Sequence, residues 1–126
     1  MADRTAVLDR ARSMIALAES LGSATPGAAG LAYQAADLAC KVLLIMLDGS
    51  DIWSHEARRQ RLSELLGVDA GDLALLHRTR QLDFYADTAP GAPFELPTAE
   101  ESQRAIMIAR RVIDAALARL DREKLD

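Results

Sequence analysis

The chain has few residues that could cross-link the fold or anchor it in a membrane. It contains one cysteine, Cys40, so an intramolecular disulfide is impossible and a reducing, intracellular setting is the simpler interpretation. No apolar run approaches the roughly 20 residues of a membrane span. Residues 1–12 carry charges of both signs where a signal peptide would have an apolar core. We therefore expect a cytoplasmic protein without a membrane segment.

Basic residues are also in the minority. Lys and Arg number 15 against 19 Asp and Glu, which gives a net charge of −4. This balance argues against a general phosphate-binding surface of the kind that dominates duplex DNA affinity. Thirteen of the 15 basic residues are arginine, whose planar fork suits carboxylates and phosphates. A local basic patch is compatible with this composition. The alternative is that the arginine excess reflects a GC-rich genome and solvated helix faces.

The period-two alternation of a half-buried strand is missing as well, and the apolar residues recur at helical spacing. The sequence predicts one all-α domain, residues 1–126, folded as an antiparallel up-and-down bundle of four to five helices. The second and last helices are the longest and should form its spine. The predicted helices cover residues 3–21, 25–48, 54 or 55–66, 70–86 and 98–124.

Local signals set these boundaries. Glycines at three predicted helix ends suit the left-handed conformation found there. Thr25 followed by Pro26 is typical of a helix start, with Thr as the cap. Thr98 and Glu101 form a capping box at the start of the last helix. Residues 87–97 contain three prolines and should form an extended loop.

Residues with obvious chemistry are few. The two histidines, His55 and His77, and Cys40 lack the close spacing of a zinc site, so no metal is expected. Gly27 and Gly30 occur as GAAG with no preceding strand, which does not make a phosphate-binding loop, and no cofactor is expected. Cys40 lies in an apolar run and is interpreted as a small buried hydrophobe rather than a nucleophile.

The helix predicted over residues 70–86 is the exception. At about 100° per residue, His77, Arg80, Phe84 and Asp87 fall within one stripe, with Asp83 beside it. Arg80 could be held by Asp83 or Asp87 while His77 stands one turn away, which would make a small polar site. The alternative is an ordinary ion pair on a solvated face, worth a few tenths of a kcal/mol.

Several segments together resemble a known family. LAYQAADLACKVLLIMLDG looks like a long Ala-rich second helix with an aromatic residue near its start, and SHEARRQRLSELLG like a short histidine-containing helix. RQLDFYAD, the proline loop and TAEE are similar to a later arginine motif, loop and final helix. This pattern is typical of HEPN domains, the helical domains of prokaryotic toxins, defence ribonucleases and nucleotidyltransferase partners. Their usual signature is R-x(4 to 6)-H, whereas this chain has R-x4-Y.

The resemblance implies roles for individual residues. Arg80 corresponds to the motif arginine, Gln81 to the polar residue that often follows it, and Tyr85 to the terminal histidine or tyrosine. Asp83 lies one residue early relative to the form R-x-x-A-D-Y. Arg80 and Tyr85 are therefore candidate catalytic residues, and His77, Arg80, Gln81 and Asp83 are candidate RNA- or nucleotide-binding residues.

In active family members, arginine and histidine from two subunits cleave RNA without metal. That chemistry needs a cation to stabilise charge on the phosphorus and an imidazole to move a proton near neutral pH. A tyrosine side chain ordinarily titrates near pH 10 and is a poor base at neutral pH. The resemblance thus implies a homodimer with weak or lost ribonuclease activity.

Two hypotheses from different classes follow. In the first, the protein acts with RNA or a nucleotide, beside a nucleotidyltransferase or antitoxin partner, in a toxin-antitoxin, defence or nucleotidyltransferase-linked system. Tyr85 would then donate a hydrogen bond or accept a modification. In the second, the site is degenerate and the domain is a non-catalytic protein-protein interaction module. Trp53 is interpreted as a cover of the core rather than a base-stacking residue.

Overall fold

Five helices make up the computed structural model, which describes residues 3–51, 54–86 and 95–124. The helices are α1 (Arg4–Leu21), α2 (Ala28–Asp48), α3 (His55–Leu66), α4 (Ala70–Tyr85) and α5 (Ala99–Lys124). No strand occurs within these described ranges. The predicted all-α helical bundle is confirmed. Most of the predicted proline loop, like Trp53 and Asp87, lies outside the described residues.

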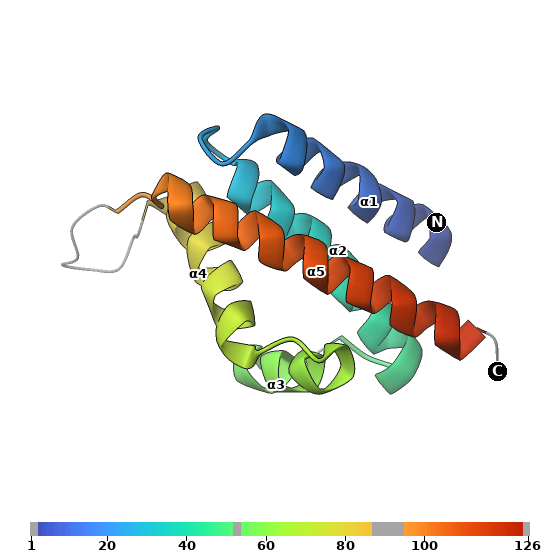
Figure 1. The fold of residues 1–126 in the computed structure, drawn as a ribbon. Helices are drawn as coiled ribbons and strands as arrows, with labels where there is room; N and C mark the ends of the chain where they lie inside the picture. Colours follow the sequence, from blue (N-terminus) through green and yellow to red (C-terminus); the bar gives the residue numbers. More distant parts are fainter. Residues whose placement is uncertain (1–2, 52–53, 87–94, 125–126) are drawn as a thin grey trace.

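The long helices α1, α2 and α5 lie side by side, and α3 and α4 lie on one side of them (Figure 1). α1 runs antiparallel to α2, α4 returns obliquely, and α5 runs back in the direction of α2. α2 is the central element, because it packs against α1, α4 and α5. α3 crosses between the end of α2 and the start of α4 (Figure 1). The two longest helices, α2 and α5, thus form the predicted spine.

Small side chains let α2 occupy this central position. Ala32, Ala35 and Ala39 are fully buried, and a helix face of methyl groups permits a close approach of neighbouring helices. Larger apolar side chains from α1, α2 and α5 fill the remaining space at the density typical of protein interiors. The largest fully buried ones are Ile15, Leu43, Leu44, Ile108, Val112 and Ile113.

α2 is also the one helix of the described chain whose length and apolar composition would allow a membrane span. Its mean hydropathy over the most apolar window is 1.5, and half of that window is buried inside the bundle. The apolar character that the sequence spreads along residues 28–48 therefore serves packing against α1 and α5. The expectation that no apolar run approaches the length of a membrane span therefore does not hold for residues 28–48.

Most predicted helix boundaries are confirmed, and one is wrong. Thr98 and Glu101 form the capping box, with hydrogen bonds of 2.9 and 3.0 Å between each backbone N–H and the other side chain. Thr25 does not cap α2. Its hydroxyl donates to the carbonyl of Leu21 at 2.7 Å, and the N-cap of α2 is Gly27, whose φ of 88° lies in the left-handed region that glycine tolerates.

Ion pairs attach α3 to the end of α2. The Arg61 guanidinium donates two hydrogen bonds of 2.8 Å to the two carboxylate oxygens of Asp48. This bidentate contact lowers the pKa of Asp48. Arg58 lies 2.9 Å from Asp37 on α2 and 3.1 Å from Asp51. These contacts fix the start of α3 beside α2, where the candidate site lies.

Candidate functional site

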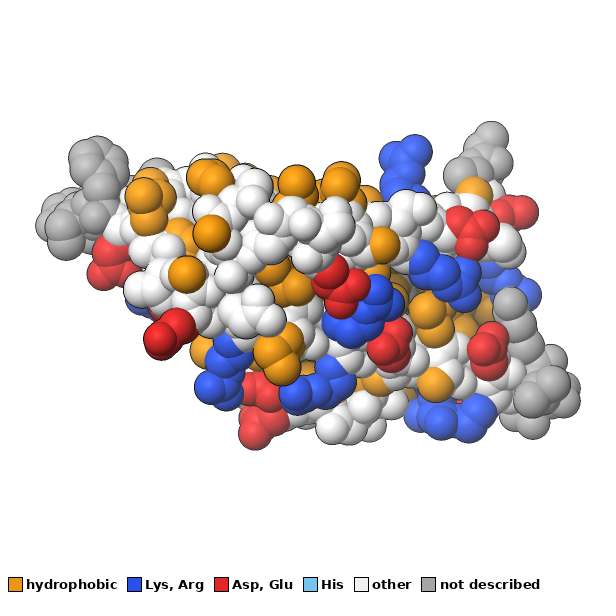
Figure 2. Space-filling view, turned by 45° about the horizontal axis from the view of Figure 1, so that its top comes forward, with side chains coloured by type: hydrophobic (Ala, Val, Ile, Leu, Met, Phe, Trp, Pro, Cys, Tyr) orange, Lys and Arg blue, Asp and Glu red, His pale blue; other side chains and the backbone are white. Residues whose placement is uncertain are grey.

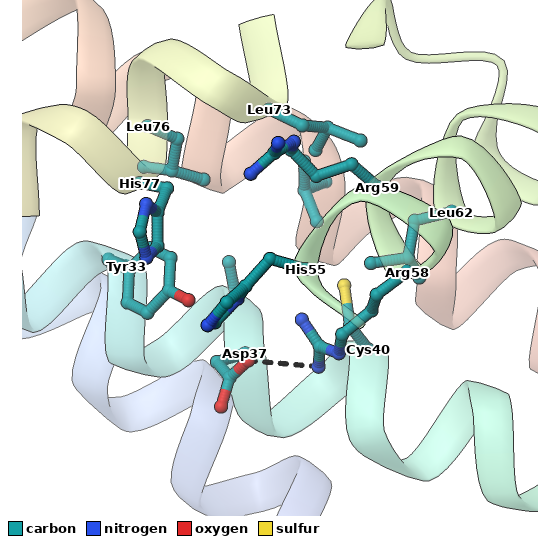
Figure 3. Close-up of a pocket in the computed structure, with 12 residues that line it drawn as sticks. Tyr33, Asp37, Cys40, His55, Arg58, Arg59, Leu62, Leu73, Leu76 and His77 are labelled. Atoms are coloured by element: carbon teal, nitrogen blue, oxygen red, sulfur yellow. Dashed lines mark ion pairs between the residues drawn. The ribbon is translucent and has the colours of Figure 1, made fainter. Parts of the chain in front are cut away.

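A small pocket opens where α2, α3 and α4 meet (Figure 3). Its volume is about 40 Å³, enough for a few water molecules and too small to enclose a nucleotide. A larger ligand would have to lie over its mouth. The apolar side of the lining is formed by Ala36, Leu62, Leu73, Leu76 and Val112. The polar side is formed by Tyr33, Asp37, Cys40, His55, Arg58, Arg59 and His77.

Both histidines of the chain meet at this pocket. His55 is the first residue of α3, and His77 lies in the middle of α4. Their ring centroids are 5.2 Å apart, and the ring of Tyr33 lies 5.7 Å from His77 with its edge toward it. Burial lowers the pKa of His77, and the neighbouring His55, Arg80 and Arg59 lower it further. The His77 imidazole is therefore mainly neutral near pH 7, a form that can accept a proton.

The two adjacent arginines of α3 have different surroundings. Arg58 lies between Asp37 and Asp51, so its charge is compensated within the fold. Arg59 lines the pocket and reaches from α3 toward α4 (Figure 3). No carboxylate among the described residues forms an ion pair with it. Its positive charge acts on His77 instead, since it contributes to the lowered pKa of that imidazole.

Arg80 extends this cationic region along α4. Its guanidinium carbon lies 5.1 Å from the centre of the Tyr33 ring and 5.4 Å from that of Tyr85, both within the range of cation–π attraction. One terminal nitrogen donates to the side-chain oxygen of Gln81 at 2.9 Å. Its Nε is buried without an acceptor among the described residues. Rings and an amide, rather than a carboxylate, hold Arg80 in place.

Asp83 has a role that the sequence did not reveal. Its two carboxylate oxygens accept hydrogen bonds from the backbone N–H groups of Gly27, at 3.0 Å, and Gly30, at 2.7 Å. The side chain therefore caps the N-terminus of α2, where the helix dipole favours a negative charge. The interpretation of Asp83 as a partner of Arg80 is wrong, since no ion pair joins these two described residues. Capping also occupies both oxygens that would face a ligand.

The next residue of α4 packs on the same turn of α2. A methyl group added at Gly30 would overlap the ring of Phe84, so the ring lies directly on the glycine backbone. Phe84 nevertheless keeps 43% of its surface exposed, and Tyr85 keeps 50%. The two rings meet edge to face with centroids 6.3 Å apart. Glycine at position 30 thus lets α4 approach α2 closely while both aromatic side chains stay accessible.

The structure brings some predicted site residues together and separates others. His77, Arg80, Gln81 and Tyr85 all lie on α4, and Arg80 contacts both Gln81 and Tyr85. Three further residues at the site, Tyr33, His55 and Arg59, come from α2 and α3. The sequence marked the first two only as an aromatic residue and a histidine within segments that resemble the family. Nothing in the spacing of Arg59 distinguished it from Arg58.

Cys40 lines the pocket but is fully covered by protein. Burial raises the pKa of its thiol to about 12, so almost none of it is in the nucleophilic thiolate form near neutral pH. Within the described part of the chain, no group of three or more His, Cys, Asp or Glu side chains could hold a metal ion. The chemistry available at the pocket is therefore that of imidazole, guanidinium and phenol groups.

Outside the pocket the surface charge is mixed. On the face shown in Figure 2, basic and acidic side chains lie beside one another. Several of them form ion pairs, such as Arg110 with Glu19, which joins α5 to α1. Arginines that are paired in this way attract phosphate less, because a carboxylate already compensates their charge. Beside the pocket, Arg59 and Arg80 have no carboxylate partner among the described residues.

Comparison of the chain with protein-family models, with curated proteins and with solved structures finds no match.

Proposed function

We propose that this protein is a HEPN-like helical domain that binds RNA or a nucleotide through its phosphate groups at the mouth of the α2–α3–α4 pocket. One observation carries the proposal. Two arginines, Arg59 and Arg80, lie beside a histidine pair and have no carboxylate partner among the described residues. A positive region of this kind in a chain of net charge −4 suits a local anionic ligand.

The chemistry of the residues favours phosphate as the anion. A guanidinium group presents a planar fork of N–H donors that matches two phosphate oxygens, and such charge-assisted hydrogen bonds are among the strongest in proteins. Stacking on Tyr33 and Tyr85 restricts the motion of the Arg80 guanidinium, so less entropy is lost when it binds. A bound phosphate would also favour the protonated form of His77 and draw a proton onto it.

Cleavage of RNA is weak or lost in this proposal. The motif position that carries histidine in active relatives is Tyr85, whose ring packs against the Arg80 guanidinium. A phenol there supplies a hydrogen-bond donor and a surface for stacking, but no base near neutral pH. His77, one turn before Arg80, is the imidazole that could support residual proton transfer. Tyr85 is half-exposed and could accept a modification.

The wider setting follows from the same resemblance. We propose a cytoplasmic homodimer that acts in a toxin-antitoxin, defence or nucleotidyltransferase-linked system, with a nucleotidyltransferase or an antitoxin as its partner. A gene for a small nucleotidyltransferase or an antitoxin next to the gene for this protein would support that setting. Light scattering of the purified protein should give the mass of a dimer. A monomer at micromolar concentration would contradict the proposed homodimer, and with it a site formed by two subunits.

The binding proposal is tested with purified protein and a labelled, structured RNA in fluorescence anisotropy. Arg80→Ala should weaken binding about tenfold or more, which corresponds to the loss of one charge-assisted contact. Arg78→Ala is the matched control, since Arg78 lies on the same helix but pairs with Glu95 at 3.3 Å on the exposed side. If the wild-type chain neither binds nor cleaves the RNA, the nucleic-acid proposal should be dropped.

A second candidate is the non-catalytic interaction module. The observation that favours it is the exposure of large apolar side chains away from the pocket. Leu17 and Leu21, one turn apart on α1, are 50% and 44% exposed, and Met107 on α5 is 56% exposed. Neighbouring exposed apolar residues, such as Leu17 and Leu21, are a feature of surfaces that contact other proteins. Replacement of Leu17 by Glu would weaken self-association or partner binding under this candidate and leave RNA binding unchanged under the first.

A further inference from the structure

Six planar side chains form a continuous row across α4, α2 and α3, which we call the ring row. Successive members are in aromatic or cation–π contact. In order, the ring row consists of Phe84, Tyr85, Arg80, Tyr33, His77 and His55. The distances between successive ring centres, with the guanidinium carbon standing for arginine, are 6.3, 5.4, 5.1, 5.7 and 5.2 Å. Three consecutive helices thus contribute to one surface feature.

The row gathers ring side chains in one place, although aromatic residues make up only 4% of the chain. Phe84, Tyr33 and Tyr85 are three of the five Phe, Trp and Tyr residues, and the row also holds both histidines. A core would be the ordinary place for large rings in a helical bundle. Here the core is built of Ala, Leu, Ile and Val instead. Tyr33, His55 and His77 line the pocket, and Phe84 and Tyr85 continue the row beyond it along α4.

Exposure differs along the row. Its two ends are open to solvent: Phe84 and Tyr85 are 43% and 50% exposed, and His55 is exposed at the other end. The middle members, Tyr33 and His77, are half-buried and hold the row against the bundle. Ring surface is therefore available at both ends, with a fixed cationic centre at Arg80 between them.

The charges beside the row are positive and available. Arg80 lies within it, and Arg59 lines the same pocket as His77 and extends toward α4 (Figure 3). The nearby carboxylates are already engaged: Asp83 caps α2, and Asp37 pairs with Arg58. Partly exposed rings beside guanidinium groups that have no carboxylate partner among the described residues are a combination suited to single-stranded nucleic acids, whose bases stack on rings while their phosphates bind cations.

We propose that the ring row binds single-stranded RNA, with bases stacked on Phe84 and Tyr85 at one end and on His55 at the other, and phosphates on Arg80 and Arg59. This inference rests on the proposed function and names its substrate class. A duplex cannot offer its base faces to the row, because they are stacked inside the helix. The pocket is also too small to enclose a base, so recognition takes place on the surface and tolerates different sequences.

The test compares two labelled RNAs of about 12 nucleotides, one unstructured pyrimidine-rich strand and one blunt duplex of the same length. Anisotropy titrations at fixed salt should show the single strand bound at least about tenfold more tightly. Phe84→Ala and Tyr85→Ala should each weaken single-strand binding by about fivefold or more, as expected for the loss of one stacking surface. Tyr85→Phe keeps the ring and should retain most of the binding. Leu17→Ala on α1 is the control for an exposed apolar side chain outside the row.

Each outcome discriminates between the two proposals. Preference for the single strand together with weaker binding of both ring variants supports the ring row as the binding surface. Equal binding of strand and duplex, with the ring variants at wild-type affinity and only Arg80→Ala impaired, overturns the ring row and leaves phosphate binding standing. Absence of binding to both RNAs by the wild-type protein overturns the proposed function as well. Circular dichroism melts of each variant show whether a loss of binding reflects a loss of folding.

Discussion

Replacement of Asp83 by alanine tests how the start of α2 is held. The carboxylate of Asp83 reaches from α4 to two backbone N–H groups, those of Gly27 and Gly30, at 3.0 and 2.7 Å. These groups belong to the first turn of α2, where no carbonyl within the helix can accept from them. The alanine variant removes the acceptor, the negative charge at the positive end of the helix and one link between α4 and α2.

The magnitude follows from the number and kind of bonds lost. A cap with one side-chain hydrogen bond is worth about 1 kcal/mol, and a hydrogen bond to a charged group about 1.5 to 3 kcal/mol. Asp83 makes two such bonds in a half-buried setting. We expect Asp83→Ala to lower the free energy of unfolding by about 2 to 3 kcal/mol. Asp69→Ala removes one exposed cap bond of 2.8 Å, to Gly71, and should cost about 1 kcal/mol.

Urea denaturation followed by circular dichroism at 222 nm measures both variants, and a double-mutant cycle with Arg80→Ala separates the two roles considered for Asp83. Because Arg80 is held by Tyr33 and Tyr85 rather than by Asp83, the coupling energy between positions 80 and 83 should stay below about 0.5 kcal/mol. A coupling above about 1 kcal/mol, or an Asp83→Ala variant as stable as the wild type, would refute the capping role.

Two further predictions concern the interior of the pocket. The lowered pKa of His77 means that the fold favours its neutral imidazole, so the stabilisation is complete above the ordinary value of 6.5 and is lost as the pH falls through the lower folded-state pKa. Urea midpoints measured between about pH 7.5 and 5 should fall with pH in the wild type and fall less in His77→Gln; parallel slopes would contradict this account. The second prediction concerns Cys40, whose thiol pKa is raised to about 12. At pH 8 this thiol should react with a disulfide reagent far more slowly in the native protein than in the urea-unfolded chain. Equal rates in the two states would show that the cysteine is accessible.

Local sequence signals predicted the helices well, because helix ends are decided by nearby residues. Thr98 and Glu101 satisfy each other's backbone N–H groups across a single turn, so the sequence alone predicts where α5 begins. The start of α2 was predicted wrongly for the opposite reason. Its cap comes from Asp83, more than 50 residues further along the chain, and no local pattern at Thr25 can reveal a partner that distant.

The candidate site shows the same division. Helical periodicity placed His77 and Arg80 on one face of α4, since residues three apart on a helix are neighbours whatever surrounds them. It also suggested Asp83 or Asp87 as a carboxylate partner for Arg80; the contacts of Asp83 contradict the first alternative, and Asp87 lies outside the described residues. The carboxylate of Asp83 turns toward α2, and the rings of Tyr33 and Tyr85 take its place beside the guanidinium.

The sequence by itself determined the helical class, the extent of most helices and the face on which His77 and Arg80 lie, because these depend on apolar spacing and on caps made within one turn. Only the tertiary structure decided what surrounds them. The packing of α3 against α4, together with the ion pairs of Arg58 and Arg61 to α2, brings the ring of His55 to 5.2 Å from that of His77 and places Arg59 at the pocket. An arginine stays without a carboxylate partner only if no carboxylate lies near it in the folded protein. Those positions depend on tertiary packing, which local sequence patterns do not specify.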